Sequence, residues 1–268
     1  MFTVFEKKPK KGVVVKKKVL FCLIVVVLFA GKAYAGRPFS TEDGYVSKKD
    51  EFQVELSVES VDEKFDENSW SVNITPIYGV TDLLEISADL SYAYIDNAFS
   101  FGGEKGLADI GVCLKYLVLN ESESMPSLVA KTYFKFDNGS YSKGIGTGSK
   151  EASLEFAMSK EFGKLVFHSN VGYVFTFDKE EECISDYIIY GIGCEYKWND
   201  KLNFIFELFC SSDSCENISS FSKHSVEPKI GAIYFYNEKI SFDFFLMKSY
   251  VDWDEQSFSC GTGITFLF

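Results

Sequence analysis

The chain has 268 residues, a formal net charge of −12, and a composition that is 46% hydrophobic and 17% aromatic. Nucleic acids need a basic protein surface, so this acidic balance excludes a nucleic-acid partner. Beyond residues 19–30 there is no long apolar run, so the remaining apolar residues must follow some other pattern.

Residues 1–35 have the three parts of a secretory signal peptide. Lysines from Lys7 to Lys18 form a basic region, residues 19–30 are apolar, and Ala33-Tyr34-Ala35 has the small-x-small pattern of a cleavage site. The apolar run is shorter than the about 20 residues that a spanning helix needs. We therefore predict export and cleavage, with an uncleaved anchor as the alternative. Removing residues 1–35, with eight lysines and one glutamate, changes the net charge from −12 to −19.

Residues 36–50 follow the predicted cleavage site and precede the first regular pattern. They form either an extension that hangs in the periplasm or a small plug inside the domain that follows. A short segment next to a chain end is usually untethered, which favours the periplasmic extension.

From residue 51 onward, apolar and polar residues alternate. Leu84 and Ile86, for example, alternate with Glu85 and Ser87. A period of two places the two sets on opposite faces of a sheet. The pattern predicts twelve strands, at about residues 52–59, 69–78, 83–94, 107–118, 128–136, 151–159, 165–177, 187–198, 202–210, 226–236, 240–250 and 257–268.

The connectors and the two faces predict how these strands are arranged. Turns after even-numbered strands are mostly tight, as at residues 79–82 and 237–239, whereas connectors after odd-numbered strands are generally longer. The apolar face carries only one charge, Lys248, and the other face is polar. A soluble barrel, the alternative, would turn its apolar face inward. We predict an all-β fold, a transmembrane up-and-down antiparallel β-barrel of about twelve strands over residues 51–268.

The polar face would line the lumen of this barrel. Its charged residues number eleven acids and five bases, so an open pore would prefer cations or neutral solutes. A filled interior of paired charges is the alternative. The candidate lumen-lining residues are Glu55, Glu59, Glu85, Asp89, Asp109, Lys115, Lys131, Lys135, Glu151, Glu155, His168, Asn170, Glu195, Lys197, Glu207, Glu227, Lys229 and Asp243.

Aromatic residues of the apolar face gather near strand ends, where amphipathic rings favour the membrane–water interface. Tyr78 and Trp198 are examples at the predicted periplasmic ends, and Trp70 and Tyr94 at the other ends. Pro76 and Pro228 fall within predicted strands, where each removes a hydrogen-bond donor, so a bulge or a different strand boundary is expected there.

The cysteines and histidines predict one disulfide and no catalytic or metal site. Export permits disulfides, and the hairpin centred near residues 199–200 places Cys183 opposite position 216, next to Cys215, while Cys210 and Cys215 are close along the chain. The predicted bond is Cys183–Cys215 or Cys210–Cys215. His168 and His224, the only histidines, show no serine–histidine–acid spacing. We expect no catalytic residue, no metal and no cofactor.

Short motifs along the mature chain resemble those of the family labelled MetA-pathway of phenol degradation. Residues 36–43 (GRPFSTED) resemble its Ala-Arg-Pro-Leu-x-Thr-Asp-Asp opening. Similar motifs are YGVTDLLE at residues 78–85, GLADIG at residues 106–111, GTGS at residues 146–149 and NVGY at residues 170–173. The resemblance implies an outer-membrane barrel with a role in the uptake of small, often hydrophobic, organic compounds.

These patterns together predict an exported protein of the cell outer membrane. Its expected function is passive passage of small solutes, hydrophobic or aromatic compounds among them, with a closed structural or surface-interaction barrel as the alternative. Expected partners are outer-membrane lipid and lipopolysaccharide, an unidentified small solute, and the barrel insertion machinery. A last strand ending in Phe268 resembles the signal which that machinery reads.

Overall fold

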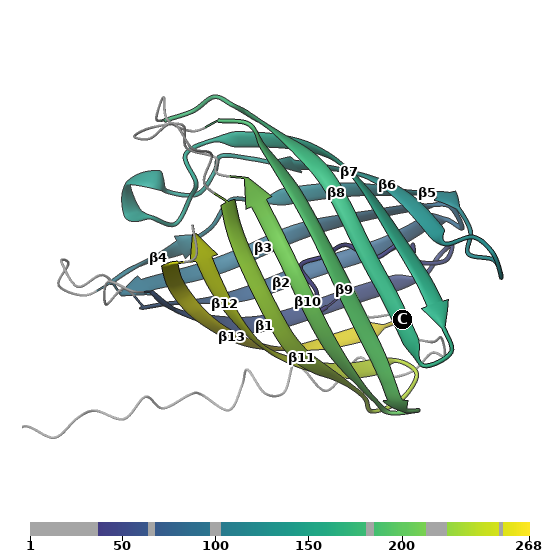
Figure 1. Ribbon diagram of the computed structural model, residues 1–268. Helices are drawn as coiled ribbons and strands as arrows, with labels where there is room; N and C mark the ends of the chain where they lie inside the picture. Colours follow the sequence, from purple (N-terminus) through teal and green to yellow (C-terminus); the bar gives the residue numbers. More distant parts are fainter. Residues whose placement is uncertain (1–36, 64–67, 97–102, 181–184, 213–223, 252–253) are drawn as a thin grey trace, which may run out of the picture.

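The strands of the chain form a closed barrel (Figure 1). The computed structural model describes residues 37–63, 68–96, 103–180, 185–212, 224–251 and 254–268. The strands are β1 (Phe52–Glu63), β2 (Asn68–Thr81), β3 (Leu84–Asp96), β4 (Glu104–Leu107), β5 (Gly111–Leu119), β6 (Ser127–Lys135), β7 (Lys150–Phe162), β8 (Leu165–Phe177), β9 (Tyr187–Asn199), β10 (Leu202–Ser212), β11 (His224–Phe235), β12 (Ile240–Val251) and β13 (Asp254–Leu267). A 3₁₀ turn, η1 (Tyr141–Lys143), lies between β6 and β7.

All paired strands are antiparallel, and the first strand closes the barrel on the last. Val54 of β1 pairs with Phe266 of β13 on one side and with Pro76 of β2 on the other. Both β4 and β5 pair with β3, at successive stretches separated by residues 108–110. They are therefore two parts of one barrel strand, and the prediction of a twelve-stranded antiparallel barrel is confirmed.

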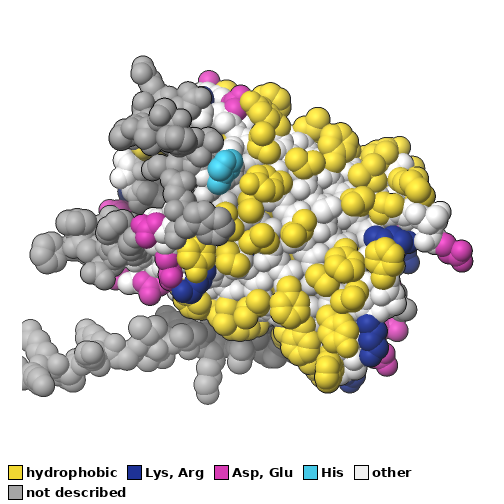
Figure 2. Space-filling view, in the orientation of Figure 1, with side chains coloured by type: hydrophobic (Ala, Val, Ile, Leu, Met, Phe, Trp, Pro, Cys, Tyr) yellow, Lys and Arg dark blue, Asp and Glu magenta, His cyan; other side chains and the backbone are white. Residues whose placement is uncertain are grey.

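Burial in this barrel is the reverse of that in a soluble protein. Phe206 of β10 is 55% exposed, whereas the next residue, Glu207, is 7% exposed. Figure 2 shows hydrophobic side chains spread over the outer wall, with charged side chains near its two ends. Because apolar side chains point out and polar ones point in, the wall suits a barrel that faces lipid outside and water inside.

The described residues contain no helix that is long and apolar enough to cross a membrane.

The two prolines lie within strands without the predicted bulge. The β2–β3 pairing runs from Ile74–Leu90 to Ile77–Ser87 with two pairs missing around Pro76 and no change of register. The β11–β12 pairing skips Pro228 in the same way. Each proline still pairs with its other neighbouring strand. The ladder therefore loses hydrogen bonds on one side only, which a proline requires because it has no N–H.

Aromatic side chains from neighbouring strands contact one another near the barrel ends. Phe52 packs on Phe268 with ring centroids 5.7 Å apart, at the end where the chain terminates. Trp70 stacks on Tyr94 at 5.7 Å near the opposite end. These contacts place aromatic rings at both edges of the apolar wall, as interfacial girdles require.

Candidate functional site: the barrel lumen and its N-terminal segment

Residues 37–50, which we call the luminal belt, lie inside the barrel (Figure 1). The sequence favoured a periplasmic extension, and the structure corrects this preference in favour of the plug. The belt has no strand of its own. Its contacts begin at the end of β2, pass along the inner faces of the wall strands, and finish at β12 and β1.

The belt leaves the wall at a backbone clamp next to β2. Asp50 N donates to Gly79 O at 2.8 Å, and Gly79 N donates to Glu51 O at 2.9 Å. A Cβ at Gly79 would lie 1.8 Å from Lys48 O, so only glycine allows this approach. Asp50 has a positive φ of 62°, which turns the chain into the lumen.

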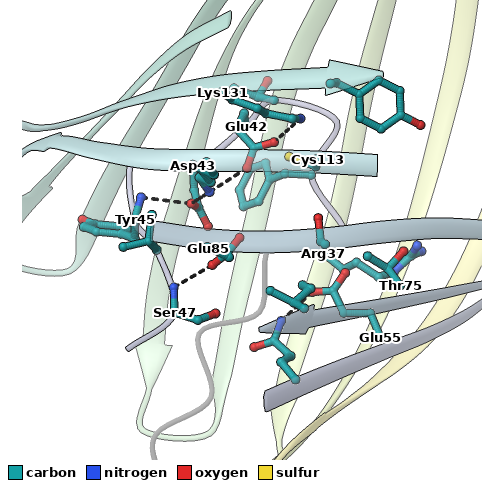
Figure 3. A pocket seen from close by; sticks show the side chains of 18 of the residues that line it. Arg37, Glu42, Asp43, Tyr45, Ser47, Glu55, Thr75, Glu85, Cys113 and Lys131 are labelled. Carbon is teal, nitrogen blue, oxygen red and sulfur yellow. Dashed lines mark hydrogen bonds and ion pairs between the residues drawn. The ribbon is translucent and has the colours of Figure 1, made fainter. Parts of the chain in front are cut away.

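Two lysines of the wall hold the acidic middle of the belt, and Figure 3 shows one of them, Lys131, beside Glu42. Lys115 Nζ contacts Glu42 Oε1 at 2.7 Å and Asp43 Oδ1 at 2.6 Å. Lys131 forms an ion pair with the other oxygen of Glu42. Burial raises the pKa of Glu42, but the attraction of the two ammonium groups outweighs burial and holds that pKa well below its usual range.

A serine–histidine pair lies next to this point. Ser159 Oγ is 2.7 Å from His168 Nδ1 and accepts the Gly44 N–H at 2.7 Å. Ser127 Oγ donates to Gly44 O at 2.5 Å. Residue spacing alone did not reveal the Ser159–His168 pair. Ser159 is fully buried, so its hydroxyl anchors the belt rather than facing a solute.

The first residues of the belt contact the opposite wall. Glu207 accepts the Ser40 N–H at 3.0 Å and also the Thr41 N–H. Lys229 Nζ donates to Pro38 O at 3.1 Å and also to Ser40 Oγ. These residues of β10 and β11 therefore bind mainly the backbone of the belt.

Arg37 completes the circuit of the wall. Its Nη2 is 3.2 Å from Glu59 Oε1 of β1, and its Nε is 3.7 Å from Asp243 Oδ2 of β12. Because the clamp is on β2, which neighbours β1, the belt spans the inner circumference of the barrel. Its two ends approach the same region of the wall.

The predicted lumen residues that do not contact the belt pair with one another or with the wall. Lys135 contacts Glu151 at 2.5 Å, and Lys197 contacts Glu161 at 2.6 Å. The remaining pairs are Asn170 with Glu155, Asn203 with Glu195, and Thr75 with Asp89. Glu227 is a half-buried residue of β11. All five predicted lumen lysines are thus in ion pairs, whereas several acids contact only neutral groups.

Asp109 has a role that the sequence did not indicate. It lies in the break between β4 and β5, where one carboxylate oxygen accepts the Gly139 N–H at 2.8 Å. The other accepts the Thr147 N–H at 2.8 Å and the Thr147 hydroxyl at 2.9 Å. The β6–β7 connector that Asp109 holds also packs Ile145 on the inner face of β4, where a Cβ at Gly106 would lie 3.4 Å from Ile145 Cδ1. Asp109 therefore fixes a connector over the lumen.

Two cavities flank the belt. One, of about 520 Å³, lies against the β1–β6 side and is lined by Glu55, Asp89 and Tyr133. The other, of about 550 Å³, lies against β8–β11 and is lined by His168 and Ile233. Residues Phe39, Asp43 and Tyr45 of the belt line both cavities. The belt therefore divides a hollow interior into two cavities.

The inner wall also has apolar positions that strand alternation did not single out. The buried inner residues include Val166, Ile205, Ile233 and Phe245. Alternation identifies which face of the sheet a residue occupies. The residues that contact the inner face belong to the belt, and several lie more than 100 positions away in the sequence. The charged side chains within the segment 37–48 were the sequence signal that this segment could bind the polar inner face.

Of the two alternative pairings for the one predicted disulfide, Cys210–Cys215 is wrong. Cys210 is a free thiol in the structure, so it does not bond to Cys215. Its backbone pairs with Tyr190 and Val226 in the ladders of β10, which fixes it within the wall. Cys183 and Cys215 lie outside the described residues, and the Cys183–Cys215 bond stays a prediction.

Comparison with known proteins places this barrel among outer-membrane proteins by fold. A family model described as "Putative MetA-pathway of phenol degradation" matches residues 35–250. A search of curated proteins found no match.

Among solved structures, the COG4313 outer membrane channel from Pseudomonas putida F1 is similar, with a TM-score of 0.69 at 13% identity over 86% of this chain and 100% of that one. The NanC porin has a TM-score of 0.55 at 10% identity, covering 79% and 98%. The KdgM porin has a TM-score of 0.54 at 9% identity, covering 80% and 98%. At such identities the likeness is one of fold.

Proposed function

The chain belongs to the MetA-pathway of phenol degradation family, and we propose that it is an outer-membrane channel for passive passage of small solutes. The observation that carries this proposal is the hollow interior, with cavities of about 520 and 550 Å³ behind an apolar outer wall. A barrel that served only as an anchor would need no such spaces. Hydrophobic or aromatic compounds are candidate solutes because the family description names phenol degradation.

The charges of the lumen favour cations and neutral solutes. Every predicted lumen lysine is neutralised by an acid, while Glu55 and Asp89 line the cavity of about 520 Å³ with only amide or hydroxyl partners in hydrogen-bond contact. A surplus of negative charge repels anions from a narrow passage. No catalytic role is assigned to the Ser159–His168 pair, because it holds the belt.

The proposal places the protein in the outer membrane after signal cleavage. Lipid and lipopolysaccharide would contact the apolar wall. The insertion machinery would read the last strand, whose Phe268 N–H donates to Phe52 O at 2.8 Å at the barrel seam.

A closed structural barrel is the second candidate, and the belt is the observation that favours it. Planar-bilayer recordings distinguish the channel from the closed barrel. They compare the refolded full-length protein with a variant that lacks residues 38–46. Heat-modifiable migration in gels verifies that each barrel is folded. Discrete conductance steps from either protein support passage. If both proteins insert and neither conducts, the passage function is overturned.

A further inference from the structure

The wall residues that hold the luminal belt are already paired with one another. Lys131 of β6 contacts Glu155 of β7 at 3.5 Å, and the two are register partners. Lys229 of β11 contacts its register partner Glu207 of β10 at 3.2 Å.

The same holds at the other anchor points. Ser159 and His168, 2.7 Å apart, are register partners on β7 and β8. Lys115 of β5 is the register partner of Glu85 of β3, and Glu85 accepts the Ser47 N–H of the belt at 2.6 Å. Each of these four anchors is thus one member of a polar pair that the barrel itself brings together, whereas the buried Asp243 is paired with Arg37 of the belt.

This pairing within the wall lowers the electrostatic free-energy cost of releasing the belt. Removing one partner of a buried ion pair is costly when the other is left without a counter-charge. Here Lys131 would keep Glu155, and Glu207 would keep Lys229. Release would therefore not strand these charges in the wall.

The contacts between the belt and the wall differ in kind from those within the sheet. Beyond the backbone clamp of residues 48–51 on Gly79, residues 37–47 bind the wall through hydrogen bonds and ion pairs in which at least one partner is a side chain. Backbone hydrogen bonds of the kind that hold a strand in a sheet join the belt to the wall only at the clamp. Residues 48–50, with the positive φ of Asp50, are the natural hinge.

We propose that residues 37–47 form a displaceable strap, hinged at residues 48–50, that divides the lumen when docked and joins its two cavities into one passage when released. The inference rests on the proposed channel function and assigns its regulation to the belt. Phe39, Asp43 and Tyr45, which line both cavities, would leave together.

A reversible crosslink tests the strap. A Cβ built at Gly191 of β9 lies 2.5 Å from Thr41 Oγ1, so the double substitution Thr41→Cys and Gly191→Cys places two thiols within bonding reach. We expect the oxidised double variant to show an open-channel probability lower by about tenfold or more than the same protein after reduction. The reduced protein is its own matched control, and the two single variants control for the native cysteines.

Chemical labelling supplies a second readout that does not depend on conductance. Thr41 is 2% exposed when docked, so a cysteine in its place reacts with a polar maleimide only after the belt is released. We expect Thr41→Cys to be labelled in the folded protein, at a rate that is slow compared with the exposed control Ser124→Cys and fast compared with unfolding of the barrel. Peptide mass analysis distinguishes position 41 from native thiols.

The outcomes separate the strap from the channel. If the variant lacking residues 38–46 conducts, but the oxidised and reduced crosslink variants conduct equally, the strap is overturned and the channel stands. Labelling of Thr41→Cys only at the rate of barrel unfolding also overturns the strap. If folded proteins of every kind fail to conduct, the channel function fails, and labelling alone then decides whether the belt is released.

Discussion

Lys115 of β5 and Lys131 of β6 are register partners whose ammonium groups face the lumen side by side. Like charges directly opposite on neighbouring strands destabilise a sheet. Glu42 of the belt contacts both lysines, so an N-terminal residue neutralises a repulsion in the middle of the barrel wall.

Replacing Glu42 by Gln should weaken this part of the barrel. The substitution keeps the shape but removes the charge that the two lysines share. We expect a loss of about 2 kcal/mol in the free energy of unfolding, measured by urea denaturation in lipid vesicles. Glu123→Gln in an exposed periplasmic connector is the matched control and should cost almost nothing. Equal effects from the two substitutions would contradict the bridging role.

The stabilisation by Glu42 should depend on pH in a defined direction. Burial raises its pKa, but the attraction of the two lysines is larger, so its folded pKa lies below that of the unfolded chain, about 4. A carboxylate of this kind contributes stability that is complete above the unfolded pKa and is lost as the pH falls toward the folded pKa. The difference between wild type and Glu42→Gln should stay constant from about pH 8 to 5 and shrink below about pH 4. A difference that grows on acidification would refute this assignment.

The membrane-facing orientation of the wall predicts that a lysine is much more costly at one outward residue than at another. Phe206 lies in the middle of β10 and Trp198 near the end of β9, and both are more than half exposed. We expect Phe206→Lys to cost about 2–4 kcal/mol in vesicles and Trp198→Lys about 0–1 kcal/mol, because the cost of a charge falls from the bilayer centre to the interface. Similar costs at both positions would argue against a membrane-spanning wall.

Ion selectivity should follow the acids of the polar cavity. Neutralising Glu55 and Asp89 together, as Glu55→Gln and Asp89→Asn, should lower the ratio of cation to anion permeability by about twofold or more. Reversal potentials in a salt gradient measure this ratio. The control is Glu123→Gln, outside the lumen, for which no change is expected. Unchanged selectivity in the double variant would place the ion path elsewhere.

Peptide mapping without reducing agent tests the remaining disulfide. We expect Cys210 to be recovered as a free thiol and Cys183 to be recovered linked to Cys215. Thiol reactivity after denaturation provides the control for incomplete labelling. Recovery of Cys183 and Cys215 as free thiols would remove the prediction.

The sequence by itself was sufficient for the barrel, because each strand is a local pattern. Alternation in a segment such as residues 165–177 gives both its bounds and its two faces, and β8 has those same bounds. The polar row was likewise readable, so residues such as Glu155 and Glu207 could be assigned to the lumen before the fold was known. The family motifs are local as well.

Only the tertiary structure decided what fills that lumen. Gly44 meets Ser159 across 115 residues and Thr41 meets Glu207 across 166, and no periodicity links such positions. The belt has no regular structure, so its place depends on side chains that come together only when the barrel closes. The hydrogen bonds of Asp109 to the β6–β7 connector could not be inferred from the sequence for the same reason, since they depend on residues 30 to 38 positions away. Short-range sequence patterns specify the strands of the barrel wall, whereas the position of the belt in the lumen is decided only when the barrel closes.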